Sequence, residues 1–176
     1  KLLPDEWQIL EQSAGRICKA PLYIDETPGI TLTEFVAKAK RLVREKGVKI
    51  IFVDYLQLMH SGKPQLGGFS KVQEVTEISN TLKTTAKELN IPIIALAQLN
   101  RNLMSRMGSN GKPVLSDLKD SGSIEQDADI VLFLYREKYY DGEKKDGEEK
   151  GDPNKAECIV AKNRHGEVGT VDLHWD

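Results

Sequence analysis

The sequence predicts an α/β fold in which a mostly parallel β-sheet is flanked by helices. Residues 49–53, 91–97 and 129–135 are almost continuously apolar, as strands buried on both faces of a parallel sheet are. Between the first two, residues 71–89 carry apolar side chains at steps of three or four, with polar side chains on the other face. Apolar strands separated by an amphipathic helix are typical of a parallel sheet covered by helices.

Turn and cap signals predict the elements before the first of these strands. Acidic residues followed by apolar residues at helical spacing predict a short helix from residue 5 that stops near Gly15. Residues 21–25 are predicted to form a brief strand that leaves into a turn containing Pro and Gly. Thr31 and Glu34 have the spacing of a capping box, which predicts that a second helix begins there and continues to Gly47.

The remaining elements follow from similar signals. Ser70 ends a loop rich in Gly, Ser and Pro and begins the amphipathic helix. Residues 136–153 are mostly charged and have little to pack, which predicts a mobile surface loop. Residues 155–162 and 167–175 are rich in β-forming residues and joined by a short polar turn, which predicts a carboxyl-terminal β-hairpin at one edge of the sheet.

Composition excludes several classes of protein. The formal net charge is −2, so a contact with nucleic acid requires a local basic patch rather than a basic protein. Cys18 and Cys158 lie far apart, outside any zinc-type spacing, and favour two reduced thiols in a cytosolic protein. No stretch of 18 apolar residues is present, so no membrane partner is expected. The first residue is Lys1, from which we expect the chain to begin inside a longer protein or after processing.

Polar side chains follow two of the predicted strands. Asp54 comes directly after the first strand, and Gln98 follows the second. Ligands of open parallel sheets gather outside the carboxyl ends of the strands. A carboxylate there can hold Mg²⁺, usually through water, and an amide can sense a γ-phosphate or orient water. Taken alone, Asp54 can equally cap a strand end, and Gln98 can satisfy backbone groups of a loop.

The phosphate-binding half of such a site is absent from the sequence. No G-x-x-x-x-G-K-[ST] loop, whose backbone N–H groups and Lys cradle phosphates, occurs in the 176 residues. The sequence therefore predicts part of a catalytic domain.

Four ordered motifs resemble the DnaB-type family of bacterial replicative DNA helicases. The resemblance covers essentially the whole chain, and a fifth segment near the start, Tyr23-Ile24-Asp25-Glu26-Thr27-Pro28, also fits. The motifs are Val53-Asp54-Tyr55-Leu56-Gln57-Leu58, Ala97-Gln98-Leu99-Asn100-Arg101, residues 116–129 (SDLKDSGSIEQDAD), and Ala161-Lys162-Asn163-Arg164-His165-Gly166. The resemblance implies that residues 1–176 form a partial RecA-like P-loop NTPase domain. The amino-terminal part of that domain, which holds the phosphate loop, is not in this sequence.

The resemblance also implies roles for individual residues. Asp54 resembles the Walker B carboxylate, which holds Mg²⁺ for ATP, and Gln98 resembles the residue that couples the γ-phosphate to the DNA-facing loops. Lys162 and Arg164 resemble a pair of cations that reach in trans into the nucleotide site of the neighbouring subunit. Residues i and i+2 of an extended segment face the same side, so the two cations can act together. Outside this motif, edge-strand cations that block unwanted strand pairing are the simpler interpretation.

A second group of residues resembles the DNA-contacting loops of the family. Arg101 follows the second strand end, and Lys119, Asp120 and Gly122 lie in the segment that resembles the central-channel loop. A glycine permits close approach to a phosphate, and a lysine supplies charge, so such contacts are independent of base sequence. Single-stranded DNA is the partner that the family resemblance implies.

The family resemblance sets the functional expectation. It implies the motor of a cytoplasmic homo-hexamer that unwinds duplex DNA at the replication fork with ATP and Mg²⁺, with primase and a helicase loader as partners. The chain by itself is expected to be inactive. Two alternatives remain open from the residues: a RecA-type recombination or repair ATPase, and a catalytically inactive RecA-like adaptor.

Overall fold

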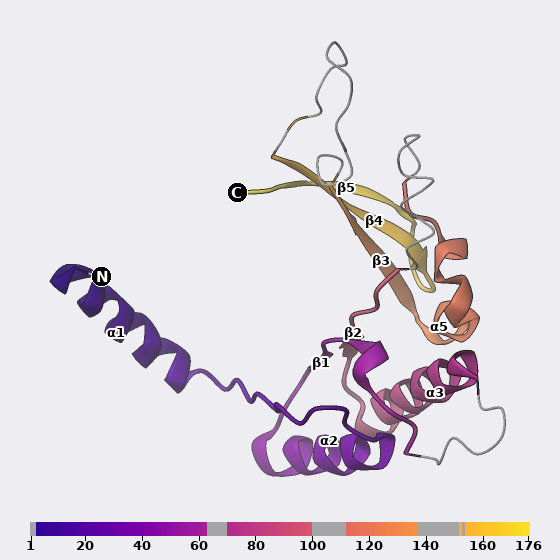
Figure 1. The fold of residues 1–176 in the computed structure, drawn as a ribbon, viewed down its shortest axis with the longest axis horizontal. Coiled ribbons are helices and arrows are strands. Elements are labelled where there is room, and N and C mark those ends of the chain that lie inside the picture. The colour runs from indigo at the N-terminus through magenta and orange to yellow at the C-terminus, as the bar shows by residue number, and fades with distance from the viewer. Residues whose placement is uncertain (1–2, 63–69, 100–111, 137–151, 153) are drawn as a thin grey trace.

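The computed structural model describes residues 3–62, 70–99, 112–136, 152 and 154–176. Figure 1 shows the arrangement of the elements in these ranges. In chain order they are α1 (Pro4–Lys19), α2 (Leu32–Lys46), β1 (Ile51–Val53), the 3₁₀ helix η1 (Leu56–Leu58), α3 (Lys71–Leu89), β2 (Ile93–Ala95), the 3₁₀ helix η2 (Leu115–Ser121), α5 (Gly122–Asp127), β3 (Ile130–Tyr135), β4 (Lys155–Asn163) and β5 (Gly169–His174).

The amino-terminal helix α1 extends away from the rest of the protein, to which an extended segment connects it (Figure 1). It continues through Gly15 to Lys19, so the expected stop at Gly15 is wrong; one Gly inside a helix costs only about 1 kcal/mol. Its apolar side chains are exposed, Trp7 by 58%. The strand expected at residues 21–25 is also wrong, because this stretch is extended but pairs with no strand among the described residues.

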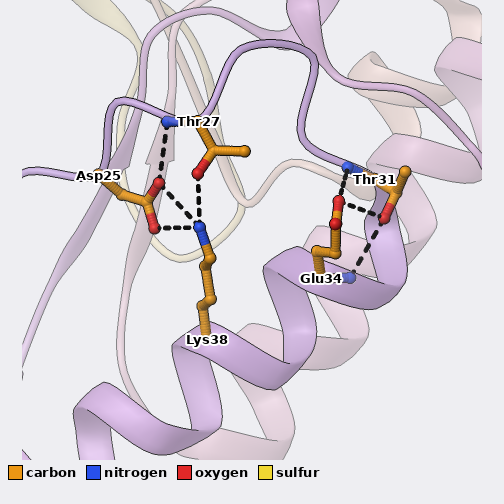
Figure 2. Close-up of polar contacts among 5 residues, drawn as sticks. All are labelled: Asp25, Thr27, Thr31, Glu34 and Lys38. Carbon is orange, nitrogen blue, oxygen red and sulfur yellow. Dashed lines mark hydrogen bonds and ion pairs between the residues drawn. The ribbon is translucent and has the colours of Figure 1, made fainter.

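Helix α2 begins and ends where the sequence predicts. Glu34 N donates to Thr31 Oγ1 at 3.3 Å, and Thr31 N donates to Glu34 Oε2 at 3.0 Å, so the capping box is complete (Figure 2). Gly47 closes the helix in the left-handed conformation, with φ of 65°. The preceding turn is held by Lys38, whose Nζ donates to Asp25 Oδ1 at 2.9 Å and to Thr27 Oγ1 at 2.6 Å (Figure 2).

Strands β1 and β2 form the parallel pair that the sequence predicts. Ile51 pairs with Ile93 and Val53 with Ala95. Helix α3, which begins at its predicted cap Ser70, connects the two strands. The buried core beside them joins α2, the segment after β1 and α3, and it consists of Leu32, Phe35, Leu56, Met59, Ile78 and Leu82. Because Leu56 is only 3% exposed, the chain directly after Asp54 is anchored in this core.

Strands β3, β4 and β5 form a separate antiparallel sheet in that order. The predicted hairpin is confirmed as β4 and β5, but its expected place at the edge of the parallel sheet is wrong, because both strands lie in this separate sheet. Strand β3 also forms where expected, but its inferred place in the parallel sheet is wrong, because its partner among the described residues is β4, antiparallel, with Ile130 opposite Asn163. Its side chains alternate between buried and exposed, as in a sheet packed on one face.

The predicted mobile loop, residues 136–153, lies almost entirely outside the described residues. Only Arg136 and Asp152 of this loop are described. No helix in the part of the chain that the structure describes is both long and apolar enough to cross a membrane.

Candidate functional site

Asp54 and Gln98 lie at the same edge of the parallel sheet. Asp54 directly follows β1, and Gln98 comes three residues after the end of β2. The pairing of the two strands continues beyond their ends, because Leu96 N donates to Val53 O at 2.9 Å and Leu56 N donates to Leu96 O at 2.9 Å. Both Asp54 and Gln98 are exposed. The structure therefore brings a carboxylate and an amide together at adjacent carboxyl ends, as the sequence predicts.

Gln57 fixes the backbone at Gln98, a role that sequence reasoning missed. Its Nε2 donates to Gln98 O at 3.2 Å, and Gln98 N donates to its Oε1 at 3.4 Å. One side-chain amide thus satisfies both backbone groups of Gln98 and leaves the Gln98 side chain available. Gln57 lies within a motif that the sequence analysis singled out, but nothing in that motif indicates a contact with a residue 41 positions away.

Lys162 and Arg164 converge on the carboxyl end of α5. Lys162 Nζ donates to Glu125 O at 2.5 Å and to Gln126 O at 3.3 Å. Arg164 Nη2 donates to Gln126 O at 3.1 Å. The last carbonyls of a helix have no partner inside it, so these two cations satisfy groups that α5 leaves free. The structure therefore places the pair on one side, as the spacing predicts.

Asp129 joins this cluster from the segment between α5 and β3. Its Oδ1 lies 3.4 Å from Arg164 Nη1, and its backbone carbonyl accepts from Arg164 N at 2.8 Å. Lys83 of α3 donates to its other oxygen, Oδ2. The hydrogen bond from Lys83, followed by the charges of Lys83 and Arg164, lowers the pKa of Asp129 below its ordinary value, although partial burial opposes this shift.

The turn that carries Arg164 is braced by Asn163. Asn163 Oδ1 accepts from His165 N at 3.3 Å, and Asn163 Nδ2 donates to Glu167 O at 3.4 Å. A Cβ atom at Gly166 would lie 2.5 Å from Asn163 Nδ2, so a larger residue there would displace the bracing side chain. This close approach gives a physical reason for the Gly that follows Lys162 and Arg164 in the motif.

The expected DNA-contacting residues are only partly described. Lys119 and Asp120 lie in η2 and Gly122 begins α5, so the expected turn is a short 3₁₀ helix followed by α5. Their backbone is placed, and the segment is anchored by Leu118, which is 8% exposed and packs with Val131 and Phe133. Arg101 lies outside the described residues.

The two groups of candidate residues are not in contact with each other. Within the described ranges no hydrogen bond or ion pair joins Asp54 or Gln98 to Lys162 or Arg164. Asp54 and Gln98 on one side, and Lys162 and Arg164 on the other, therefore form two separate clusters of contacts within the described residues.

The residues at the strand ends fit a magnesium nucleotide in part. Asp54 has no hydrogen-bond or ion-pair partner within the described part of the chain, and no group of three or more His, Cys, Asp or Glu residues gathers there. Mg²⁺ commonly binds through one or two carboxylates, several waters and substrate phosphates rather than through a cage of protein ligands. A single free carboxylate beside an amide meets that requirement.

These features define a class of protein. A parallel β-α-β unit with a carboxylate and an amide at adjacent strand ends, together with a distant pair of cations, is the arrangement of a RecA-like nucleotide-hydrolase core. The chain belongs to the DnaB-like helicase C-terminal domain family, whose model matches residues 1–176.

Individual relatives agree with this assignment. The chain is 47% identical over 174 residues to the replicative DNA helicase DnaB of Geobacillus stearothermophilus and 47% identical over 173 residues to the replicative DNA helicase DnaC of Bacillus subtilis. These alignments cover 98% of this chain but 36% of each relative. The chain thus spans about a third of the length of these curated relatives.

Solved structures show the same fold. One of them, described as an ATPase domain, superposes with a TM-score of 0.83 at 36% identity, covering 99% of this chain and 58% of that one. A DnaB-like replicative helicase, whose structure was described with its interactions with primase, superposes with a TM-score of 0.82 at 35% identity over 99% of this chain and 40% of that one. The predicted RecA-like α/β class is therefore confirmed.

Proposed function

We propose that this chain is part of the ATP-driven motor of a hexameric replicative DNA helicase that translocates on single-stranded DNA and unwinds duplex at the replication fork. The observation that carries the proposal is the division of its candidate residues into two separate groups within a DnaB-like fold. Asp54 and Gln98 occupy strand ends, whereas Lys162 and Arg164 gather on α5. We call the full-length protein that carries this chain the parent helicase.

The strand-end group serves the nucleotide of its own subunit. Asp54 would hold Mg²⁺, usually through water, and the ion would neutralise charge that develops in phosphoryl transfer. Gln98, whose backbone Gln57 holds in place, directs its side-chain amide at the γ-phosphate or the attacking water. The phosphate loop that completes this site is supplied by another part of the parent helicase, so the chain by itself hydrolyses almost no ATP.

The cation group serves the nucleotide of the neighbouring subunit. A cation brought to the γ-phosphate stabilises the charge that develops in phosphoryl transfer, and an arginine in this role accelerates hydrolysis by about 10³-fold or more. Action in trans requires a head-to-tail assembly in which each subunit offers one surface to the next, and the closed ring proposed here is such an assembly. Such a ring makes hydrolysis depend on the contact between subunits.

Contacts with DNA are assigned to Arg101, Lys119, Asp120 and Gly122. The positive charges of Arg101 and Lys119 and the backbone N–H groups of Asp120 and Gly122 suit phosphates rather than bases, and a motor that must accept any sequence needs contacts of that kind. Primase and a helicase loader are the expected protein partners, and the cytoplasm, at replication forks, is the expected location. A RecA-type recombination ATPase and an inactive adaptor are not favoured by the family match.

Two substitutions in the parent helicase test the site. Asp54→Ala and Arg164→Ala should each lower DNA-stimulated ATP hydrolysis by about 10³-fold and abolish unwinding of forked DNA. The first removes the carboxylate that would hold Mg²⁺, and the second removes a cation that would stabilise charge in the transition state. Glu45→Ala, which alters an exposed carboxylate at the end of α2, is the control. Unwinding at the wild-type rate by either variant contradicts the role given to that residue.

Mixing the two inactive variants tests action in trans. In a ring assembled from equal amounts of Asp54→Ala and Arg164→Ala subunits, about a quarter of the sites combine an intact Asp54 with an intact Arg164 from the neighbour. Part of the ATPase activity should therefore return on mixing. Failure to recover activity in mixed rings shown to contain both subunits would contradict action in trans.

A further inference from the structure

The carboxyl end of α5 forms a cradle for the two cations. We define the α5 cradle as the backbone carbonyls of Glu125 and Gln126 together with the carboxylate and carbonyl of Asp129. Lys162 contacts only backbone carbonyls of the cradle. Arg164 contacts a carbonyl through Nη2, the Asp129 carboxylate through Nη1 and the Asp129 carbonyl through its own backbone N–H. Arg164 is thus held at three atoms.

Asp129 is the one side chain in the described structure that fixes the orientation of the Arg164 guanidinium. It is itself fixed from the opposite side, because Lys83 of α3 donates to Oδ2 while Arg164 lies against Oδ1. An aspartate is ordinarily ionised at neutral pH, and the pKa of Asp129 is lowered further, first by the hydrogen bond from Lys83, so its negative charge lies against both cations. Lys83 and Arg164 come from α3 and from the turn after β4, so Asp129 joins two distant parts of the chain.

The contacts leave part of the guanidinium available to a ligand. A guanidinium has five N–H donors in a rigid plane, and the cradle occupies Nη1 and Nη2 on the side that faces α5 and Asp129. The Arg164 side chain is 45% exposed, so part of it remains accessible to a ligand. An arginine side chain is long and has many rotamers. When contacts already hold it in one orientation, its rotamer entropy is not lost during ATP hydrolysis, which lowers the barrier to that step.

We propose that Asp129, anchored by Lys83, is a positioning residue that orients Arg164 for its action on the neighbouring subunit's nucleotide. The inference rests on the proposed function and assigns a task to two residues that the motif reasoning left without one. Asp129 touches neither nucleotide nor DNA in this scheme. It acts through Arg164 alone.

The chain offers a matched control for Asp129. Asp25 is also an exposed aspartate whose pKa is lowered by a lysine, in this case Lys38, to about 2. Its side chain is 40% exposed against 48% for Asp129. The two carboxylates differ in that only Asp129 contacts Arg164. Asp129→Asn and Asp25→Asn therefore make the same chemical change in similar surroundings.

Steady-state ATP hydrolysis by the parent helicase with saturating single-stranded DNA tests the inference. Asp129→Asn should lower kcat by about 10-fold and leave the KM for ATP within about 2-fold, because misplacing a transition-state group by a fraction of an ångström affects the chemical step rather than binding. Asp25→Asn should leave both constants unchanged. A kcat for Asp129→Asn equal to that of Asp25→Asn overturns the inference, as does a rise in KM with kcat unchanged.

A double variant separates orientation of Arg164 from general loss of structure. Once Arg164 is removed, Asp129 has nothing to orient, so Arg164→Ala with Asp129→Asn should be no slower than Arg164→Ala alone. A further fall of about 10-fold would overturn the inference. If Asp129→Asn does not assemble into rings, Lys83→Met tests the same role, because it removes the lysine that holds the Asp129 carboxylate in place. It should lower kcat by about 3-fold, and an unchanged kcat contradicts the inference.

The outcome also separates this inference from the proposed function. If Arg164→Ala hydrolyses ATP as fast as wild type, the trans-acting role itself fails. If Arg164→Ala is inactive and Asp129→Asn is fully active, the trans-acting role stands and the positioning role of Asp129 fails.

Discussion

Helices α2 and α5 are stabilised in opposite ways. Helix α2 has 15 residues, a capping box at its start, a left-handed Gly at its end and buried residues on one face. Helix α5 has six residues, and its last carbonyls are satisfied by Lys162 and Arg164, which lie at and just after the end of β4, more than 35 residues later. The two ends of α2 are therefore set by residues at its own termini, whereas the carboxyl end of α5 is satisfied by residues of the antiparallel sheet.

The same contrast holds for the two aspartate–lysine pairs. Asp25 and Lys38 are 13 residues apart and join a turn to the helix that follows it (Figure 2). Asp129 and Lys83 are 46 residues apart and join α3 to the turn that carries Arg164. The first pair therefore fixes a local turn, while the second fixes a side chain with a proposed catalytic role across a long stretch of sequence.

The largest expected effect tests whether α2 also depends on tertiary packing. Phe35→Ala removes a side chain that is 8% exposed and packs in the core with Ile78 and Leu82. It should lower the free energy of unfolding by about 3 to 4 kcal/mol, through lost burial and the cavity that remains. Urea denaturation of the chain measures this, with Val72→Ala, at a site 49% exposed, as the control. A loss below about 1 kcal/mol would show that α2 is stable without its core contacts.

The next effect tests the local start of α2. Thr31→Ala removes the acceptor for Glu34 N and should lower the free energy of unfolding by about 1 kcal/mol. Thr33→Ala makes the same substitution two residues later, at an exposed position, and should change it by less than about 0.5 kcal/mol. Equal effects in urea denaturation would contradict the capping role of Thr31.

A smaller effect tests the dependence of α5 on distant cations. Lys162→Met removes the donor to Glu125 O and Gln126 O, and amide hydrogens of α5 should exchange about 3-fold faster, since a cation at a helix carboxyl end contributes a fraction of a kcal/mol. Exchange in α2 should not change. Hydrogen exchange measured by mass spectrometry makes the comparison, and equal changes in both helices would contradict it.

The smallest effect concerns pH. The pKa of Asp25 is lowered from 3.8 to about 2, chiefly by its hydrogen bond with Lys38. A carboxylate with a lowered pKa adds stability that is fully present above its unfolded pKa and is lost as the pH falls through its folded pKa. The pair is exposed, so the contribution is about 0.5 kcal/mol or less. Lys38→Met should reduce the fall in melting temperature between about pH 4 and about pH 2, whereas an identical fall would contradict the assignment.

Much of the fold can be predicted from the sequence because its signals are local. The capping box of Thr31 and Glu34, the cap at Ser70 and the carboxyl-terminal hairpin lie where the patterns place them. The errors are of two kinds. Gly15 does not stop α1, because one glycine is a weak signal, and β3 pairs with β4 rather than joining a parallel sheet, because an apolar run does not specify its partner.

The candidate site divides in the same way. Sequence patterns were sufficient to place Asp54 and Gln98 at strand ends and Lys162 near Arg164, because side-chain direction within one element follows from backbone geometry. Three contacts emerge only from the packed chain: Gln57 holds the backbone of Gln98, α5 receives the two cations, and Asp129 bridges Lys83 and Arg164. They join residues 35 or more positions apart, and they exist only once the helices and strands have packed together.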